Sequence, residues 1–236
     1  METQAPVVLI TGAAGNLGQA VARAFAASGA VLALTDGDEA RLHAVTTELA
    51  LPAGRCRAYA ADLIKHPAAL ALGQRASAEL GRIDVLVNIA GGFRMGPVHE
   101  TPEETWDLLL DLNARTIFNM AHAVVPGMIQ RGGGRIINIA SRGALGGAAG
   151  IGVYAAAKAA VLRLSESMAA ELREHRINVN CVLPSMIDTP QNRQAMPTAD
   201  FSAWVKADSL AEVILFLASP GARDISGAAI PVYGRS

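Results

Sequence analysis

The sequence contains few charged residues, few aromatic residues and only two cysteines. Of its 236 residues, 17% are charged and 4% are aromatic, and the formal net charge is −1. A charge so close to zero gives no general attraction to nucleic acid or to an anionic membrane, and so few aromatics disfavour a platform for stacking bases. Cys56 and Cys181 lie far apart in separate strand-like runs. This spacing excludes a disulfide framework and fits no metal site, so we expect no bound metal and a cytoplasmic location.

Long hydrophobic runs are also missing, although the mean hydropathy is positive. The longest charge-free stretch beside an apolar run, Gly143 to Ala157, contains several glycines. It is too short to cross about 30 Å of hydrocarbon. The first six residues, Met1 to Pro6, carry no basic segment ahead of an apolar one, so we expect no signal peptide and no membrane partner.

The sequence does contain many apolar residues, at 51% of the chain, in short runs separated by longer helical patterns. Most runs are unbroken Val, Ile, Leu and Ala, which is typical of strands buried on both faces of a parallel sheet. The predicted strands are Val7–Thr11, Val31–Thr35, Arg57–Ala60, Asp84–Ile89, Arg135–Ala140, Ile177–Leu183 and Ala228–Val232. The predicted helices are Leu17–Ser28, Asp38–Leu49, Pro67–Leu80, Pro102–Gln130, Val153–Glu174 and Asp208–Ala218.

This alternation predicts an α/β fold, a doubly wound, Rossmann-like parallel sheet of about seven strands with helices on both faces. A chain of this length suits one domain, here residues 1–236, that binds a dinucleotide and performs catalysis. The segment from Met186 to Val205 breaks the rhythm, because it is polar and has no clean period. Long irregular segments in compact domains are usually functional, so we expect a substrate lid at 186–205.

A glycine-rich turn follows the first predicted strand and opens the first predicted helix, reading Thr11-Gly12-Ala13-Ala14-Gly15-Asn16-Leu17-Gly18. Small residues let the backbone approach a pyrophosphate, and the helix N-terminus offers free N–H groups. We therefore predict contacts from Gly12, Asn16, Leu17 and Gly18, with a purely structural turn as the alternative. Asp36, eighteen residues after Gly18, suits the adenosine ribose hydroxyls and would repel a 2′-phosphate, which favours NAD(H) over NADP(H). The alternative is that Asp36 caps the next helix, which Asp38 could do instead.

Four polar residues form the candidate catalytic group. Tyr154 and Lys158 are four residues apart on one predicted helix, so they share a face. A nearby ammonium lowers the pKa of a phenol, which would make Tyr154 a better base. Ser141 follows a predicted strand, where ligands bind in such sheets, and Asn113 lies on the long helix before it.

At these residues the chain resembles the short-chain dehydrogenase/reductase family over nearly its whole length, in the shorter-chain branch with a variant glycine motif. The family's Tyr-x-x-x-Lys pattern reads Tyr154-Ala-Ala-Ala-Lys158, with Ser141 thirteen residues earlier. Asn113 is similar to the family's helix asparagine. Three further signatures are Asp62-Leu63, Asn88-Ile89-Ala90-Gly91 and Pro184-Ser185-Met186-Ile187-Asp188-Thr189.

The resemblance implies a role for each residue. Tyr154 would be the general acid and base, Lys158 would lower its pKa and hold the nicotinamide ribose, and Ser141 would polarise the substrate carbonyl. Asn113 would order a water that links Lys158 to solvent. Cofactor contacts are implied for Asp62, Leu63, Asn88, Ala90, Gly91, Tyr154, Lys158, Pro184, Ile187 and Thr189.

Three positions depart from the family pattern. Asn16 and Ser185 stand where glycine is usual, and Ile89 stands where asparagine is usual. Asn tolerates positive φ better than most residues, so the turn at Asn16 can survive. We expect these departures to affect cofactor affinity and local geometry rather than the fold.

The favoured function is interconversion of a carbonyl and a secondary alcohol with NAD(H). The alternatives are a 3-oxoacyl-acyl-carrier-protein reductase that uses NADPH, and a non-catalytic dinucleotide-binding redox sensor. The complete Asn-Ser-Tyr-Lys set disfavours a sensor, because pure binding does not require Ser141.

Two further expectations concern the substrate and the assembly. Arg94, Arg142 and Arg193 fall on segments that converge at the carboxyl edge of such a sheet, so at least one could contact an anionic substrate group. The alternative is that these arginines are solvated, or that Arg142 pairs with Asp188. By resemblance, pairing through 102–130 and 153–174 would make a homo-oligomer, either a dimer or a tetramer.

Overall fold

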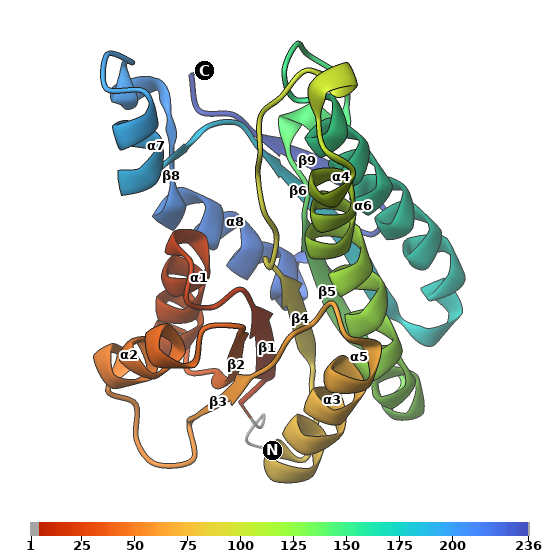
Figure 1. Ribbon diagram of the computed structural model, residues 1–236. Helices are drawn as coiled ribbons and strands as arrows, with labels where there is room; N and C mark the ends of the chain where they lie inside the picture. The colour runs from red at the N-terminus through yellow and green to blue at the C-terminus, as the bar shows by residue number, and fades with distance from the viewer. Residues whose placement is uncertain (1–4, 236) are drawn as a thin grey trace.

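The computed structural model describes residues 5–235, which leaves most of the predicted N-terminal segment, residues 1–4, outside the described part. Its main feature is a sheet of seven parallel strands in the order β3-β2-β1-β4-β5-β6-β9 (Figure 1). The strands are β1 (Val7–Thr11), β2 (Val31–Asp36), β3 (Cys56–Ala60), β4 (Val85–Asn88), β5 (Gly134–Ile139), β6 (Ile177–Pro184) and β9 (Ala229–Val232). The predicted doubly wound α/β sheet is confirmed.

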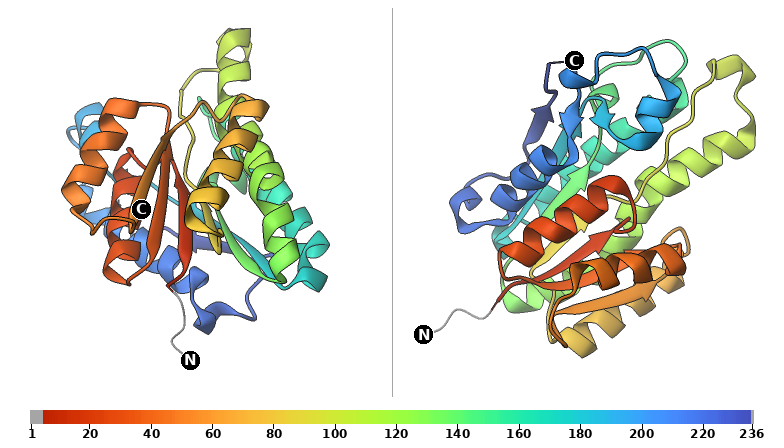
Figure 2. Two further views of the ribbon diagram at one scale, coloured as in Figure 1. Left: turned by 90° about the horizontal axis from the view of Figure 1, so that it is seen from below. Right: turned by 90° about the vertical axis from the view of Figure 1, so that its left-hand side faces the viewer.

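Helices cover both faces of this sheet (Figure 2). One face packs against α1 (Asn16–Ala27), α2 (Glu39–Leu49) and α8 (Ala207–Ala218). The other face packs against α3 (His66–Leu80), α5 (Thr116–Arg131) and α6 (Gly152–Glu171). The crossover helices therefore lie on both sides, as a doubly wound sheet requires.

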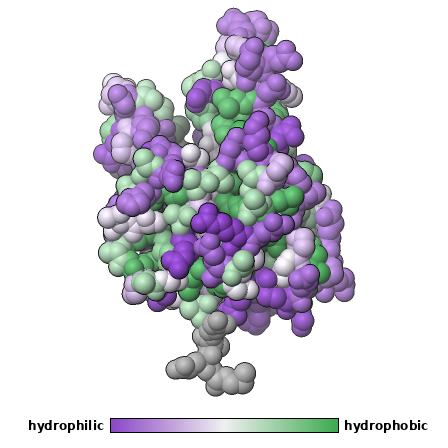
Figure 3. Space-filling view, turned by 60° about the horizontal axis from the view of Figure 1, so that its bottom comes forward, coloured by the Kyte–Doolittle hydropathy of each residue, from purple (hydrophilic) through white to green (hydrophobic). Residues whose placement is uncertain are grey.

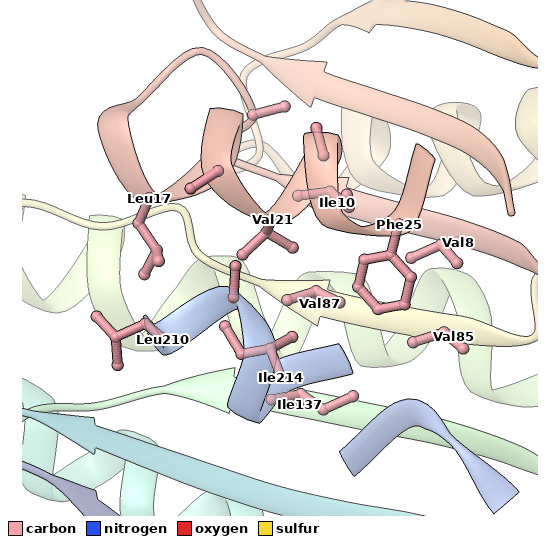
Figure 4. Close-up of a cluster of buried hydrophobic side chains, with 14 of the residues drawn as sticks. Val8, Ile10, Leu17, Val21, Phe25, Val85, Val87, Ile137, Leu210 and Ile214 are labelled. Atoms are coloured by element: carbon pink, nitrogen blue, oxygen red, sulfur yellow. The ribbon is translucent and has the colours of Figure 1, made fainter. Parts of the chain in front are cut away.

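The core explains why the strands read as unbroken apolar runs. Val8, Ile10, Val85, Val87 and Ile137 point to the face of α1 and α8, where they meet Val21, Phe25 and Ile214 (Figure 4). Their neighbours along the strands, Leu9, Leu86 and Ile136, belong to the cluster on the opposite face. Successive side chains alternate faces, so a strand covered on both sides needs apolar residues at every position.

The strand order reverses between β1 and β4, and this reversal determines where ligands bind. From β1 the chain runs to β2 and β3 on one side, then returns to β4, β5 and β6 on the other. The loops that leave β1 and β4 therefore turn in opposite directions and open a crevice at the carboxyl edge. The glycine-rich turn and Asn88 both lie at this edge.

The predicted helix over 102–130 is interrupted. It comprises α4 (Glu103–Leu110), a π-helical turn (Asp111–Arg115) and α5, with Asn113 inside the π turn. Single π turns inserted into helices occur frequently at functional sites. The periodicity did not reveal it, because one extra residue per turn leaves the apolar pattern of the flanking helices intact.

The segment predicted as a lid has regular structure of its own. It contains β7 (Ile187–Asp188), α7 (Pro190–Ala195), a 3-10 turn (Phe201–Ala203) and β8 (Val205–Lys206). β7 and β8 pair in parallel. Arg193 donates two hydrogen bonds to Asp188, at 2.6 and 2.7 Å, and its guanidinium lies 4.8 Å from the centre of the Phe201 ring. These contacts tie the segment into one small unit beside α1 and α8 (Figure 1).

Residues 5–235 meet the requirements of neither a membrane-spanning helix nor a metal site. Within residues 5–235, no helix is both long enough and apolar enough to cross a bilayer. The same residues contain no group of three or more His, Cys, Asp or Glu side chains arranged to hold a metal ion. The face in Figure 3 mixes hydrophilic and hydrophobic patches, with no broad apolar band.

Candidate active site

The glycine-rich turn is shaped so that a side chain would not fit at two positions. Gly12 has φ +65°, and a Cβ there would lie 2.8 Å from the backbone nitrogen of Ala90. A Cβ on Gly18 would lie 2.2 Å from the carbonyl oxygen of Gly12. Gly15 occupies the N-cap position of α1 and makes no side-chain hydrogen bond there. The first backbone N–H groups of α1 therefore receive no side-chain acceptor from this residue. The turn is therefore a close-fitting cradle whose N–H groups suit a pyrophosphate.

Asp36 lies beside this cradle at the end of β2. Its carboxylate accepts hydrogen bonds from the backbone N–H of Ala14, at 3.0 Å, and of Asp38, at 3.2 Å. The helix-capping role belongs to Asp38, whose side chain accepts from the N–H of Arg41. The guanidinium of Arg41 in turn donates to the carbonyl oxygen of Ala14 at 2.8 Å, so a cation lies next to the turn.

Asn16, the departure from glycine, connects the cradle to the 186–205 segment. Its side-chain amide donates to Gln191 Oε1 on α7 at 2.8 Å. Asn16 is the first residue of α1 and does not have positive φ, so it needs no left-handed turn. The next residue, Leu17, is buried in the core and anchors the start of α1.

Thr11 joins the cradle to the loop after β4. Its hydroxyl oxygen accepts from the N–H groups of Ile89, at 3.0 Å, and Ala90, at 3.1 Å. Asn88 is buried, and its amide donates to Asn138 on β5 at 2.8 Å, inside the sheet. Ile89 itself is half-buried and packs against the core, which accommodates an apolar residue in place of asparagine.

Asn113 holds the next part of this loop from both sides. Its amide nitrogen donates to the carbonyl oxygen of Gly92 at 3.0 Å, and its Oδ1 accepts from the Gly92 N–H at 3.3 Å. Asn113 is fully buried, and a Cβ on Gly91 would lie 2.6 Å from its Oδ1. The π turn therefore places an amide that fixes the backbone of residues 91 and 92.

Ser141 and Tyr154 meet at the end of β5. Ser141 Oγ accepts from the N–H of Gly143 at 3.1 Å, and the same hydroxyl lies next to the Tyr154 side chain. Burial raises the pKa of Tyr154, and the Ser141 hydroxyl lowers that pKa in part. Desolvation thus has the largest effect on the pKa of the phenol and raises it. The sequence had suggested the opposite direction, a pKa lowered by Lys158.

Lys158 lies one turn further along α6 and is buried. Its Nζ donates to the carbonyl oxygen of Ile139 at 2.9 Å and lies 6.0 Å from the centre of the Tyr154 ring. Burial lowers the pKa of Lys158 to about 8, while Cys181 acts in the opposite direction. A Cβ on Gly91 would lie 3.4 Å from the same Nζ, so the lysine also borders the loop held by Asn113.

The remaining predicted contacts border the same edge. Asp62 is exposed just after β3, and its carboxylate accepts from the N–H of Ile64, while Leu63 is buried. Pro184 is the last residue of β6. Ser185, which stands where the family usually has glycine, donates through its hydroxyl to the carbonyl oxygen of Tyr233 at 2.8 Å. The serine side chain therefore has a hydrogen-bond acceptor within the fold.

Thr189 and Ile187 lie on the 186–205 segment. The Thr189 hydroxyl oxygen caps α7 by accepting from the N–H of Asn192 at 3.2 Å, which leaves the hydroxyl proton available to donate. The carbonyl oxygen of Ile187 accepts from the Asn192 side chain at 2.8 Å. The backbone N–H of Ile187 lies on β7.

The three arginines differ in what they contact. Arg193 is bound to Asp188, whose pKa it lowers, so this carboxylate pairs with Arg193 rather than with Arg142. Arg94 donates to the carbonyl oxygen of Phe93 at 2.7 Å. The guanidinium of Arg142 lies 5.8 Å from the centre of the Tyr233 ring.

These residues together fit a dinucleotide. The cradle would clash with a side chain at Gly12 or Gly18, Asp36 flanks it, and Tyr154 and Lys158 lie where the loops after β4 and β5 converge. Thr11, Arg41, Phe93 and Gln191 belong to this site but were absent from the sequence prediction. Arg41 and Phe93 follow predicted site residues closely and could have been suspected, whereas no sequence pattern joins Asn16 to Gln191.

Comparison with protein families gives a match to the model described as short chain dehydrogenase over residues 6–200. A curated 3-oxoacyl-[acyl-carrier-protein] reductase from Thermotoga maritima is 32% identical, over 99% of this chain and 98% of its own. The chain is thus similar to proteins of one family across almost its whole length.

Solved structures agree. The 3-ketoacyl-(acyl-carrier-protein) reductase of Brucella melitensis, complexed with NADH, superposes with a TM-score of 0.88 at 30% identity, covering 98% of each chain. The gluconate 5-dehydrogenase of Burkholderia cenocepacia, in complex with NADP and tartrate, gives 0.90 at 30% identity, covering 97% of this chain and 94% of its own.

Proposed function

The chain belongs to the short-chain dehydrogenase/reductase family, and from that premise we propose that it interconverts a carbonyl and a secondary alcohol using NAD(H). The observation that carries the proposal is the convergence of Ser141, Tyr154 and Lys158 beside the glycine cradle. The family membership makes the chain an oxidoreductase. The cofactor preference and the substrate are the proposed parts.

The side chains divide the work. The hydroxyls of Ser141 and Tyr154, which lie next to each other, would together hold the substrate oxygen. Tyr154 would give its phenolic proton to that oxygen during reduction and take it back during oxidation. A bound nicotinamide supplies or accepts the hydride. Lys158, held by Ile139, would act against the raising of the Tyr154 pKa by burial, because an ammonium near a phenol favours the deprotonated form.

The cofactor would be held along the carboxyl edge of the sheet. The cradle would take the pyrophosphate, Asp36 the adenosine ribose, and Asp62 with Leu63 the adenine. The loop after β4 and the segment after β6 would border the nicotinamide half. The proposed contact residues are Gly12, Asn16, Leu17, Gly18, Asp36, Asp62, Leu63, Asn88, Ala90, Gly91, Tyr154, Lys158, Pro184, Ile187 and Thr189.

NAD(H) is favoured because Asp36 would repel a 2′-phosphate, and NADP(H) is the alternative. Arg41 moderates this preference, because its guanidinium lies beside the cradle and could partly neutralise a phosphate. The similar Brucella and Burkholderia structures hold NADH and NADP respectively. Both cofactors therefore need to be assayed.

The direct experiment is a panel of ketones assayed with NADH and with NADPH by nicotinamide absorbance. The proposal expects turnover of at least one ketone, with NADH giving the higher kcat/KM. Turnover of acyl-carrier ketones with NADPH alone would favour the second candidate function, a 3-oxoacyl-acyl-carrier-protein reductase. The similar Thermotoga protein, which is 32% identical to this chain, carries that name. Cofactor binding without turnover would favour the redox sensor.

The proposal includes the hypothesis that an arginine contacts an anionic group on the substrate. Arg142 is the arginine that we test. Arg142 follows Ser141 directly along the chain. An acidic ketone and its neutral ester form the test, because Arg142→Ala should raise KM for the acid more than for the ester. Equal increases in KM for the acid and for the ester would refute this hypothesis.

Self-association in the cytoplasm completes the proposal. The helices expected to pair carry exposed apolar side chains, with Trp106 on α4 and Phe118 on α5 about half exposed at 47% and 48%. Ala155 and Ala157 are buried against the protein itself, so the alanine-rich start of α6 serves the core in part. Both cysteines are free, which suits a reducing compartment.

A further inference from the structure

Exposed apolar side chains gather beside Tyr154. Phe93, Met95 and Val98 on the loop after β4, and Leu145 on the turn after β5, are exposed by 47%, 70%, 67% and 61%. Large apolar side chains that remain exposed in a group usually mark a binding surface. Their position beside the proposed general acid and base makes their role a question about the substrate.

The two loops that carry these side chains are tied together. The N–H of Gly96 donates to the carbonyl oxygen of Gly150 at 2.8 Å. A Cβ on Gly150 would lie 3.6 Å from Met95 Cε, and a Cβ on Gly152 would lie 2.5 Å from Val98 Cγ2. The loop after β4 therefore packs directly onto the start of α6, two residues before Tyr154.

Phe93 is the member of this group that touches the reacting side chain. Its ring lies 4.8 Å from the ring of Tyr154, measured between centroids, with the ring planes at 88°. Asn113 fixes its position, because both backbone groups of the preceding residue, Gly92, are hydrogen-bonded to that amide. The Phe93 carbonyl oxygen accepts from Arg94, which turns that guanidinium back along the chain.

We propose that Phe93, with Met95 on the same loop, forms an apolar specificity surface for an aryl or branched alkyl group on the substrate's carbonyl carbon. This inference rests on the proposed function, since it places the substrate oxygen at Ser141 and Tyr154. An apolar substituent gains by covering these side chains, and an aromatic one can also pack edge-to-face as Phe93 does with Tyr154. A polyol would leave hydroxyls unpaired against the same surface.

Binding of secondary alcohols to the NADH-loaded enzyme tests this without any chemistry, because NADH and an alcohol are both reduced and cannot react. Titration calorimetry with 1-phenylethanol and with 2-butanol gives the preference for an apolar group. We expect wild type to bind 1-phenylethanol about tenfold more tightly, the lower end of what an apolar pocket discriminates. Equal affinities, or no binding of 1-phenylethanol, would overturn the inference.

Two variants assign the preference to Phe93. Phe93→Ala should weaken 1-phenylethanol binding about 3- to 10-fold, the scale of a lost aromatic pair, and change 2-butanol binding less. Phe93→Leu should recover part of the loss, because it restores apolar contact. Equal weakening of both alcohols by Phe93→Ala would show that Phe93 serves the fold instead.

A control and a separate assay distinguish the possible failures. Phe216→Ala, which removes a 50% exposed phenylalanine on α8, should leave both affinities unchanged. Calorimetry of NADH itself comes first, and failure to bind NADH would contradict the proposed function rather than the specificity surface.

Discussion

Lys158 carries an ammonium group that the fold buries almost completely, at 6% exposure. Burial lowers its pKa from 10.5 to about 8. Between these values the unfolded chain binds more protons at this position than the native chain, so stability rises with pH across that window. Below about pH 8 both states are protonated, and the native state bears the full cost of the buried charge.

Lys158→Met should therefore stabilise the protein at pH 7. A pKa lowered from 10.5 to about 8 corresponds to about 3 kcal/mol, and the lost hydrogen bond to Ile139 offsets about 1 kcal/mol of it. The net effect is a thermal midpoint about 4–8 °C higher at pH 7. Thermal unfolding at pH 7 and pH 10.5 checks it, because the difference from wild type should shrink at the higher pH. Lys65→Met, which removes an exposed lysine, is the control. A thermal midpoint of Lys158→Met below that of wild type at pH 7 would contradict this prediction.

Asp36 should control which nicotinamide cofactor is used. Asp36→Ala removes the carboxylate that would repel a 2′-phosphate and leaves Arg41 beside the cradle. The ratio of kcat/KM for NADH to that for NADPH should fall by about tenfold or more, since a buried or paired charge contact is worth at least that much. Steady-state kinetics with both cofactors measures the ratio.

Asp38→Ala is the matched control, because it removes the cap of α2 and leaves the Asp36 carboxylate in place. It should lower the thermal midpoint without changing the cofactor ratio. A wild-type enzyme that already prefers NADPH would show that Asp36 does not have the assigned role.

At the scale of elements, the 186–205 segment is connected to the phosphate cradle through Asn16 and Gln191. The segment is internally held by the β7–β8 pair and by Arg193, so it can move as one unit. Losing the bond to Asn16 should therefore ease opening of the whole segment and speed cofactor release. This gives the unusual Asn16 a positioning role.

Gln191→Ala should raise the rate of NADH dissociation about 2- to 10-fold, the range for one hydrogen bond. Stopped-flow fluorescence of NADH release measures the rate. Gln194→Ala, on the same short helix and also exposed, is the control and should release NADH at the wild-type rate. Equal rates for the two variants would show that the bond does not retain the cofactor.

The elements also show what the sequence could predict. The strands were predictable because burial on both faces requires unbroken apolar runs. The positions of Ser141 and Tyr154 were predictable because Ser141 follows the end of β5 and Tyr154 lies at the start of α6. The π turn around Asn113 was not, because α4 and α5 each keep a helical apolar pattern and the one inserted residue only shifts the second pattern relative to the first. The Asn16–Gln191 and Asn113–Gly92 bonds depend on three-dimensional proximity between distant segments, which local patterns do not encode.

At the scale of the whole molecule, the exposed apolar residues of α4 and α5 predict self-association. Light scattering of the purified protein should give the mass of a tetramer, or of a dimer, rather than of one chain. Trp106→Glu together with Phe118→Glu should shift the mass toward a single chain, because charges in an apolar interface are costly. A wild-type mass of one chain would contradict the expected pairing.

The central claim is that Tyr154 moves the proton while a hydride passes between nicotinamide and substrate. The most direct measurement is mass spectrometry of the alcohol formed from the best ketone of the panel with NADH in which both hydrogens at the nicotinamide C4 position are deuterium. We predict deuterium on the carbinol carbon, and a rate at least about 100-fold lower for Tyr154→Phe, the usual scale for general acid–base catalysis. The thermal midpoint of Tyr154→Phe should be nearly unchanged, and Tyr59→Phe, remote from the site and bonded to Glu79, should keep the wild-type rate. Alcohol without deuterium, or full activity in Tyr154→Phe, would contradict the account.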